Sequence, residues 1–284
     1  MTISEYINNI SERLSSLYDK QEAKAVATFY TGEILSLNKT DILLNPQKEL
    51  EKSQLENLKS NEERLIGGEP VQYVTGTAWF YGLKFFVDTN VLIPRQETEI
   101  LVDIIINRYK NHGRIKILDI GTGSGCIPVT LKKYLPDAEI YAVDISTEAL
   151  KVCKENLLLN NTEIYISQYD ILSNDILPFS EMSFDVVISN PPYVLNSEKN
   201  LMHTNVVDFE PELALYVDDN DPLIFYCKIL EAIIKQESKP KELFFEINEK
   251  FASEVIDLNK KHGFGNNEII KDLNGKDRFI CGKN

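Results

Sequence analysis

The hydrophobic positions in the first 66 residues recur with the period of an α-helix. Apolar side chains stand three or four residues apart over the first 17 positions, and residues 23–35 continue the pattern with good helix formers. A later segment with leucines at helical spacing ends at Gly67-Gly68, a pair that terminates helices. The pattern predicts a small N-terminal helical bundle over residues 1–68.

From Val71 onward the apolar residues alternate as they do in a β-strand. Aromatic and β-branched side chains continue as far as Ile93, interrupted by glycines and by the turn at residues 88–90. We expect a β-hairpin over residues 69–95, which joins the bundle to a larger domain over residues 96–284.

The larger domain alternates short apolar runs with helical segments. Strand-like runs begin near residues 115, 139, 164, 184 and 243, with helical segments between the earlier ones. Two more runs, 268–270 and 278–280, can pair antiparallel across Asn274-Gly275. This order predicts an α/β fold built on a seven-stranded sheet with parallel, buried strands.

A glycine-rich loop follows the first strand of this domain and precedes a helix. Its residues are Gly121, Thr122, Gly123, Ser124 and Gly125. Glycines let the backbone turn sharply and approach a ligand where a Cβ would clash. The spacing differs from the dinucleotide fingerprint, which would place a glycine at Cys126, so an NAD site is disfavoured.

Two acidic residues follow the next strands. Asp144 ends the second strand, about twenty residues past the glycines, where a carboxylate can accept hydrogen bonds from both hydroxyls of a ribose. Asp170 and Ile171 follow the third strand, at a loop that could meet an adenine, although Asp170 is equally well explained as a turn former. Together, the loop at Asp144 and the loop at Asp170-Ile171 indicate a nucleoside-containing ligand.

The fourth strand ends in the sequence Asn190-Pro191-Pro192-Tyr193. The two prolines cannot continue a strand and hold the backbone stiff. The Asn190 side chain offers an amide oxygen, the prolines offer carbonyls without N–H groups, and Tyr193 offers a flat ring. Such a corner suits a planar NH2 group. The alternative is a strand followed by a proline-rich turn, which would leave the glycine loop upstream unexplained.

The composition limits the kinds of partner that the protein is expected to bind. A formal net charge of −14 over 284 residues argues against a surface built to bind nucleic acid. No stretch has the apolar length of a signal peptide core or a membrane span. The four cysteines are scattered without a CxxC pair, and the three histidines have no ligand spacing. We therefore expect a cytoplasmic protein with reduced thiols, no metal site and no membrane partner.

The glycine loop, Asp144 and the NPPY sequence together resemble the class I S-adenosylmethionine-dependent methyltransferases, which have a seven-stranded Rossmann-like sheet. The segment Gly68–Glu99 and the pair Glu210-Pro211 make the chain similar, more narrowly, to the protein-(glutamine-N5) methyltransferases of peptide chain release factors. This narrower resemblance covers nearly the whole chain. The chain departs from the family pattern at Gln96, at Asp221-Pro222 and at Asn248, positions that concern loop shape.

The resemblance implies transfer of a methyl group from S-adenosylmethionine to the side-chain nitrogen of the glutamine in the Gly-Gly-Gln motif of release factors, which tunes translation termination. The Asn190 oxygen and the Pro191 carbonyl would accept the two N–H bonds of that glutamine, and Tyr193 would stack on its amide. The implied catalytic residues are Asn190, Pro191, Pro192 and Tyr193. The implied cofactor-binding residues are Gly121, Thr122, Gly123, Ser124, Gly125, Asp144, Asp170, Ile171 and Asn190.

Two other functions share these motifs. A nucleic-acid methyltransferase of the N6-adenine type carries the same four residues, but it should have a basic target-binding region. A nucleotide-binding interaction module without catalysis would not need an intact NPPY sequence. The N-terminal bundle has no catalytic constellation, so it is expected to dock the release factor or, equally, to act as a structural cap.

Overall fold

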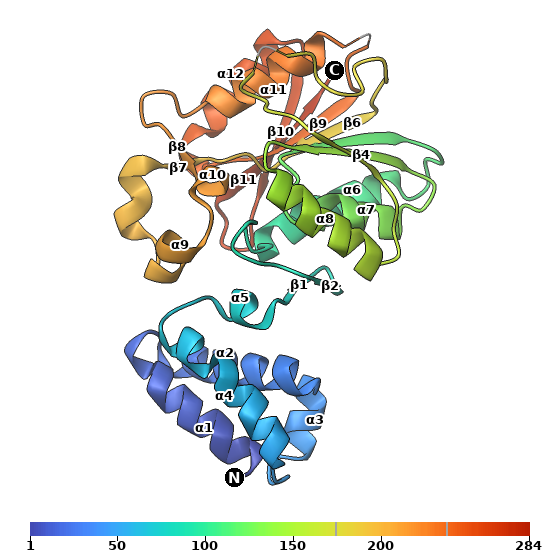
Figure 1. Cartoon of the computed structure of the whole chain (residues 1–284). Helices are drawn as coiled ribbons and strands as arrows, with labels where there is room; N and C mark the ends of the chain where they lie inside the picture. Colours follow the sequence, from blue (N-terminus) through green and yellow to red (C-terminus); the bar gives the residue numbers. More distant parts are fainter. Residues whose placement is uncertain (174, 237) are drawn as a thin grey trace. The chain divides into compact units, whose positions relative to one another are not determined.

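The computed structural model describes residues 1–173, 175–236 and 238–284 (Figure 1). The chain forms two compact units. The first comprises Met1–Thr77 and His203–Phe209, and the second comprises Ala78–Met202 and Glu210–Asn284. In the described ranges no helix combines the length and the apolar character needed to cross a membrane.

The first unit is a helical bundle, as the period of the sequence predicted. Its elements are α1 Ile3–Arg13, the short 3-10 helix η1 Leu14–Ser16, α2 Lys20–Leu35, α3 Lys39–Leu44, α4 Lys52–Ile66, α5 Val71–Thr75 and α9 Thr204–Phe209. Thr2 and Glu5 form a capping box that starts α1. One core of buried apolar side chains, which includes Ile10, Leu58 and Leu65, holds the helices from α1 to α5 together.

The segment Val71–Thr75 is helical, whereas the alternation in the sequence predicted a strand from Val71. Helical spacing brings Val71 and Val74 together into the core of the bundle. The helix follows Pro70, and Gly76 ends it with a φ of 64°. The burial of these two valines against the bundle therefore decided the local structure. The predicted hairpin is confirmed, but its strands are β1 Ala78–Phe80 and β2 Leu83–Phe85.

The second unit contains the seven-stranded sheet that the sequence predicted. Its strands are β3 Lys116–Ile120, β4 Glu139–Asp144, β5 Tyr165–Gln168, β6 Val186–Ser189, β9 Glu242–Glu246, β10 Asn266–Lys271 and β11 Asp277–Lys283. They lie in the order β10-β11-β9-β6-β3-β4-β5. The five strands from β9 to β5 are parallel, and β11 pairs antiparallel with β9 and β10. The predicted antiparallel pair near the C-terminus is confirmed.

Helices cover both faces of this sheet (Figure 1). The main helices are α6 Gln96–Tyr109, α7 Cys126–Tyr134, α8 Thr147–Leu159, α11 Ile224–Ile234 and α12 Ala252–Lys261. Successive residues of a strand point to opposite faces. Accordingly Ile117 packs in the core with α6, α7 and α8, whereas Leu118 packs in the core with α11 and α12.

Short elements complete the second unit between β6 and β9 and after β9. They are β7 Val194–Leu195, η2 Asn196–Leu201, α10 Glu212–Leu215, β8 Tyr216–Val217 and η3 Glu249–Phe251. The parallel pair β7 and β8 brings the chain after Tyr193 next to the chain after α10.

The strand order changes direction at β3. The strands β4 and β5 follow on one side of β3, while β6 and β9 follow on the other. Helices leave the sheet on opposite sides at such a point, which opens a crevice beyond the carboxyl ends of the strands. The glycine loop after β3 and the NPPY sequence after β6 meet there.

Candidate active site

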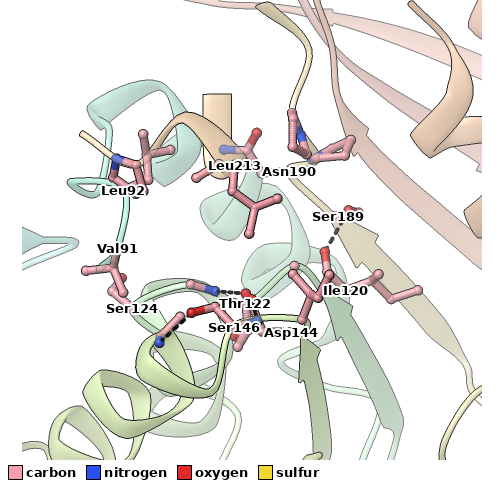
Figure 2. A pocket seen from close by; sticks show the side chains of 18 of the residues that line it. Val91, Leu92, Ile120, Thr122, Ser124, Asp144, Ser146, Ser189, Asn190 and Leu213 are labelled. Carbon is pink, nitrogen blue, oxygen red and sulfur yellow. Dashed lines mark hydrogen bonds between the residues drawn. The ribbon is translucent and has the colours of Figure 1, made fainter. Parts of the chain in front are cut away.

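A cavity of about 290 Å³ lies beyond the carboxyl ends of β3, β4 and β6. It is lined by residues 121–124 of the glycine loop, by Asp144 and by Asn190-Pro191-Pro192, together with residues 89–92, 94–95, 211 and 213–214. Figure 2 shows Leu92 and Leu213 on the opposite side of the cavity from Asp144. Apolar side chains thus form one wall, and polar groups at the strand ends form another.

The glycine loop has the backbone that its sequence predicted. Gly121, Gly123 and Gly125 have φ angles of 79°, 53° and 78°, which favour glycine. A Cβ at Gly121 or Gly123 would meet nothing within 4 Å, so these two positions leave open space for a ligand. A Cβ at Gly125 would lie 2.6 Å from Cys153 Sγ, so this glycine instead allows α7 to approach α8.

Asp144 fixes the loop and also faces the cavity. Its Oδ2 accepts a hydrogen bond of 2.8 Å from the N–H of Gly123, and its Oδ1 accepts one of 2.9 Å from the N–H of Ser146. Burial raises the pKa of Asp144 while these backbone N–H groups lower it. A carboxylate has about four lone-pair directions, so capacity remains for the hydroxyls of a ribose.

Asp170 and Ile171 both line the cavity, as the nucleoside hypothesis required. Asp170 is also a turn former, because its Oδ1 accepts a hydrogen bond of 2.8 Å from the N–H of Leu172. The two explanations offered by the sequence are therefore compatible. Its part in holding a ligand stays a prediction.

The NPPY residues divide between the cavity and the interior. Asn190, Pro191 and Pro192 line the cavity. Tyr193 is not among the lining residues of the described chain; its hydroxyl donates a hydrogen bond of 2.8 Å to Glu246 Oε1 at the end of β9. Burial raises the pKa of Tyr193 well above its ordinary value, so the hydroxyl keeps its proton.

The Asn190 amide is oriented by α6. Its Nδ2 donates a long hydrogen bond of 3.4 Å to Thr98 Oγ1, and Thr98 in turn donates one of 2.8 Å to Glu246 Oε2. Because the Asn190 NH2 group donates to Thr98, the amide oxygen of Asn190 remains as the acceptor at the end of this series of hydrogen bonds. A hydrogen bond of 2.7 Å from Ser189 to the carbonyl of Ile120 joins β6 to β3 just before Asn190 (Figure 2).

An ion pair closes one edge of the cavity. Arg95 Nη2 lies 2.8 Å from both carboxylate oxygens of Glu210, and Glu210 also accepts a hydrogen bond of 3.3 Å from the N–H of Ile93. Glu210 is buried, so this paired charge ties residues 93–95 to the start of the 210–214 segment.

Asp119 is a buried carboxyl of β3, two residues before Gly121. In the described chain neither of its oxygens has a hydrogen-bond partner of ordinary geometry. Burial raises the pKa of Asp119 to about 7, against a smaller opposing effect of the neighbouring Thr122 hydroxyl. Unsatisfied buried carboxylates are costly unless a donor or cation meets them.

These groups fit S-adenosylmethionine. The open glycine positions leave room for a ligand at the loop, and Asp144 has acceptor capacity for ribose hydroxyls. Thr98, Asp119, Glu210 and Glu246 were not identified as site residues from the sequence. For Glu246, the sequence carried one signal that could have been used, which is an acidic residue at the end of a buried strand.

Two protein-family models match the sequence. The model described as the PrmC N-terminal domain matches residues 5–76, and the model described as a methyltransferase small domain matches residues 95–208. The chain is 39% identical to a release factor glutamine methyltransferase of Flavobacterium psychrophilum, over 99% of this chain and 98% of that protein. It is 38% identical to one of Bacteroides thetaiotaomicron, over 95% and 96%.

Among solved structures, the hMettl16 catalytic domain in complex with an RNA hairpin of the MAT2A 3′UTR aligns with a TM-score of 0.57, over 71% of this chain and 75% of that one. A methyltransferase from Pyrococcus furiosus aligns with a TM-score of 0.52, over 79% and 98%. At 16% and 17% identity these two establish the fold alone. The identity to the bacterial relatives extends over nearly the full chain, and the chain therefore belongs to the family of release factor glutamine methyltransferases.

Proposed function

We propose that this protein transfers a methyl group from S-adenosylmethionine to the side-chain amide nitrogen of the glutamine in the Gly-Gly-Gln motif of peptide chain release factors. The observation that carries the proposal is the orientation of Asn190, whose NH2 group is turned to Thr98. Its oxygen remains for a donor in the cavity that Asn190 lines.

The protein's own task is to position an amide and to stabilise charge. The cofactor supplies a methyl group made electrophilic by its sulfonium. A glutamine NH2 group has two hydrogens, and Asn190 Oδ1 and the Pro191 carbonyl are two acceptors at one strand end. Acceptors held there stabilise the positive charge that develops on the amide nitrogen, and they hold that nitrogen in place for attack.

The backbone keeps these acceptors in position. Pro191 and Pro192 restrict the chain directly after Asn190 to extended geometry. The Tyr193 side chain is anchored on Glu246 by its hydroxyl, so the four residues are held at both ends. No ionisable general base is required of this arrangement, because an amide nitrogen that has accepted a methyl group is strongly acidic and loses one of its two hydrogens to water.

We also propose that the N-terminal bundle, residues 1–68, docks the release factor, with residues 69–95 as the linker and 96–284 as the catalytic domain. The segment His203–Phe209 supports this, because it belongs to the same compact unit as the bundle although it follows NPPY by ten residues. His203 stacks on Tyr18 with ring centroids 6.4 Å apart, and Asn205 donates a hydrogen bond to the Tyr18 hydroxyl. Because release factors act on ribosomes, we infer a cytoplasmic location.

Mass spectrometry of a release factor tests the proposed reaction. After incubation with this protein and S-adenosylmethionine, the peptide containing the Gly-Gly-Gln motif should gain the mass of one methyl group, located on the glutamine by fragmentation. A release factor with that glutamine changed to alanine is the matched control and should remain unmodified. Methylation of RNA or DNA under the same conditions, with an unmodified release factor, would refute the proposal.

A further inference from the structure

Three polar side chains from three elements form a hydrogen-bonded chain that runs from the cavity wall, at Asn190 and Thr98, to the buried Glu246. Glu246 ends β9, Thr98 lies in the first turn of α6, and Asn190 follows β6. The register pairs Ser189 with Phe245, so the next residues along these neighbouring strands are Asn190 and Glu246. Glu246 accepts 2.8 Å hydrogen bonds from Thr98 and from Tyr193, and Thr98 accepts one of 3.4 Å from Asn190 Nδ2.

Glu246 has no direct cationic partner in the part of the chain that the structure describes. It is 1% exposed, and the cation whose charge lowers its pKa is Arg278, whose own hydrogen bonds go to Asp272 and to the Ile247 carbonyl. A buried carboxylate without an ion pair is expensive for the fold. The hydroxyl groups of Thr98 and Tyr193 donate hydrogen bonds to Glu246 and offset that cost. The arrangement is best explained by its effect on the orientation of the Asn190 amide.

The single hydrogen of the Thr98 hydroxyl decides which end of the Asn190 amide faces Thr98. While Glu246 is ionised it can only accept, so the Thr98 hydrogen points to Glu246 and a lone pair points to Asn190. Only the NH2 end of Asn190 can meet that lone pair. The amide oxygen then faces away from Thr98.

Loss of the negative charge of Glu246 would remove this constraint on the orientation of Asn190. A neutral Glu246 could donate to Thr98, and the Thr98 hydroxyl could then donate to the Asn190 oxygen. The Asn190 amide would turn over and present its NH2 group, which cannot accept the hydrogens of a substrate amide.

We propose that Glu246 is a positioning residue that acts through Thr98 to hold the Asn190 oxygen toward the substrate amide. The inference rests on the proposed function, because only a substrate with an NH2 group needs an acceptor at this place. The carboxylate also polarises the chain of donors, which strengthens the Asn190 oxygen as an acceptor.

Glu246 is the carboxyl of this hydrogen-bonded chain, and its pKa is raised above the ordinary value. Burial raises its pKa, and Glu97 acts in the same direction, whereas the donors Thr98 and Tyr193 and the charge of Arg278 oppose this. Tyr226 donates a 3.0 Å hydrogen bond to the Glu246 carbonyl, and burial keeps its pKa well above the ordinary value. Burial likewise raises the pKa of Cys126 to about 12. The orienting charge should therefore be lost as pH falls through a carboxyl pKa above the usual range.

Kinetics of three variants test this proposal. Thr98→Val and Glu246→Gln should each lower kcat for release factor methylation by about 10- to 100-fold, because a misplaced acceptor costs that much. Their Kd for S-adenosylmethionine should change little. Thr98→Ser keeps the hydroxyl and should recover most of the kcat lost in Thr98→Val. Thr130→Val, a buried threonine of α7 away from the cavity, controls for a valine in the core and should leave kcat unchanged.

The pH profile separates positioning from a merely structural role. The wild-type kcat should fall on the acidic side, and Glu246→Gln should have a lower kcat that lacks the part of this fall due to Glu246. The carboxyls of Asp119, Asp144 and Glu210, whose pKa values are also raised by burial, are the same in both proteins. Wild-type kcat in both Glu246→Gln and Thr98→Val, or a drop in Thr98→Val that Thr98→Ser does not recover, would overturn the proposal.

An observation that needs no substrate keeps the test separate from the proposed function. In NMR spectra of the full chain, the side-chain NH2 hydrogens of Asn190 should exchange faster with water in Thr98→Val than in the wild type. Unchanged exchange would count against the hydrogen-bonded chain itself. An enzyme that fails to methylate release factors but shows this exchange difference would refute the proposed function and leave the chain intact.

Discussion

Asn190 is a short side chain whose usefulness depends on which of its two polar ends faces the cavity. The sequence placed it at the end of a buried strand, and the NPPY sequence explained its stiffness. Its orientation depends on Thr98, 92 residues away in the sequence. The neighbouring residues in the sequence therefore identify Asn190 as a functional residue, but they do not determine the orientation of its amide.

Asn190→Ala should lower kcat by about 100-fold or more, because a preorganised acceptor for developing charge contributes on this scale. The Kd for S-adenosylmethionine, measured by calorimetry, should remain close to that of the wild type. Asp144→Ala is the matched contrast and should weaken cofactor binding by roughly 10- to 100-fold, the value of a hydrogen bond to a charged group. Wild-type turnover in Asn190→Ala would remove that residue from the mechanism.

At the scale of elements, the glycine loop joins β3 to α7, and its glycines have different structural roles. Gly121 and Gly123 border open space, whereas Gly125 stands against Cys153 of α8. The sequence predicted a ligand loop from all three. The distinction required the packing of α7 on α8, just as the packing of Val71 and Val74 decided that α5 is a helix.

Gly125→Ala should lower the free energy of unfolding by about 1–3 kcal/mol, since φ is 78° there and the new Cβ would lie 2.6 Å from Cys153 Sγ. In a Cys153→Ala background the same substitution should cost less, because the clashing sulfur is gone and only the backbone strain remains. Urea unfolding of the four proteins in this double-mutant cycle measures the difference. Equal costs in both backgrounds would show that the Cys153 contact contributes nothing.

At the scale of the whole molecule, the chain crosses between its two compact units more than once. It leaves the helical unit after Thr77, returns for His203–Phe209 and leaves again. The chain that follows NPPY therefore leads to a segment, His203–Phe209, of the same compact unit as the bundle that we propose docks the release factor. Nothing in the hydrophobic pattern of residues 203–209 indicated this.

Hydrogen exchange of the full chain tests the docking proposal. Addition of an unmodified release factor should protect backbone amides in the bundle, residues 1–68, and in the His203–Phe209 segment. A short Gly-Gly-Gln peptide should protect only segments that line the cavity, such as residues 89–95 and 211–214. If the whole release factor protects no more than the peptide does, the bundle is a structural cap.

The sequence by itself determined the features that depend on local sterics and hydrophobic period. These are the helical bundle, the seven strands, the sharp glycine turn after β3 and the stiff corner after β6. Tertiary structure alone decided which distant side chains meet: Thr98 with Glu246 across 148 residues, and Arg95 with Glu210 across 115. Period and turn chemistry act over a few residues, whereas these contacts depend on strand order and register, which bring together chain segments far apart in the sequence.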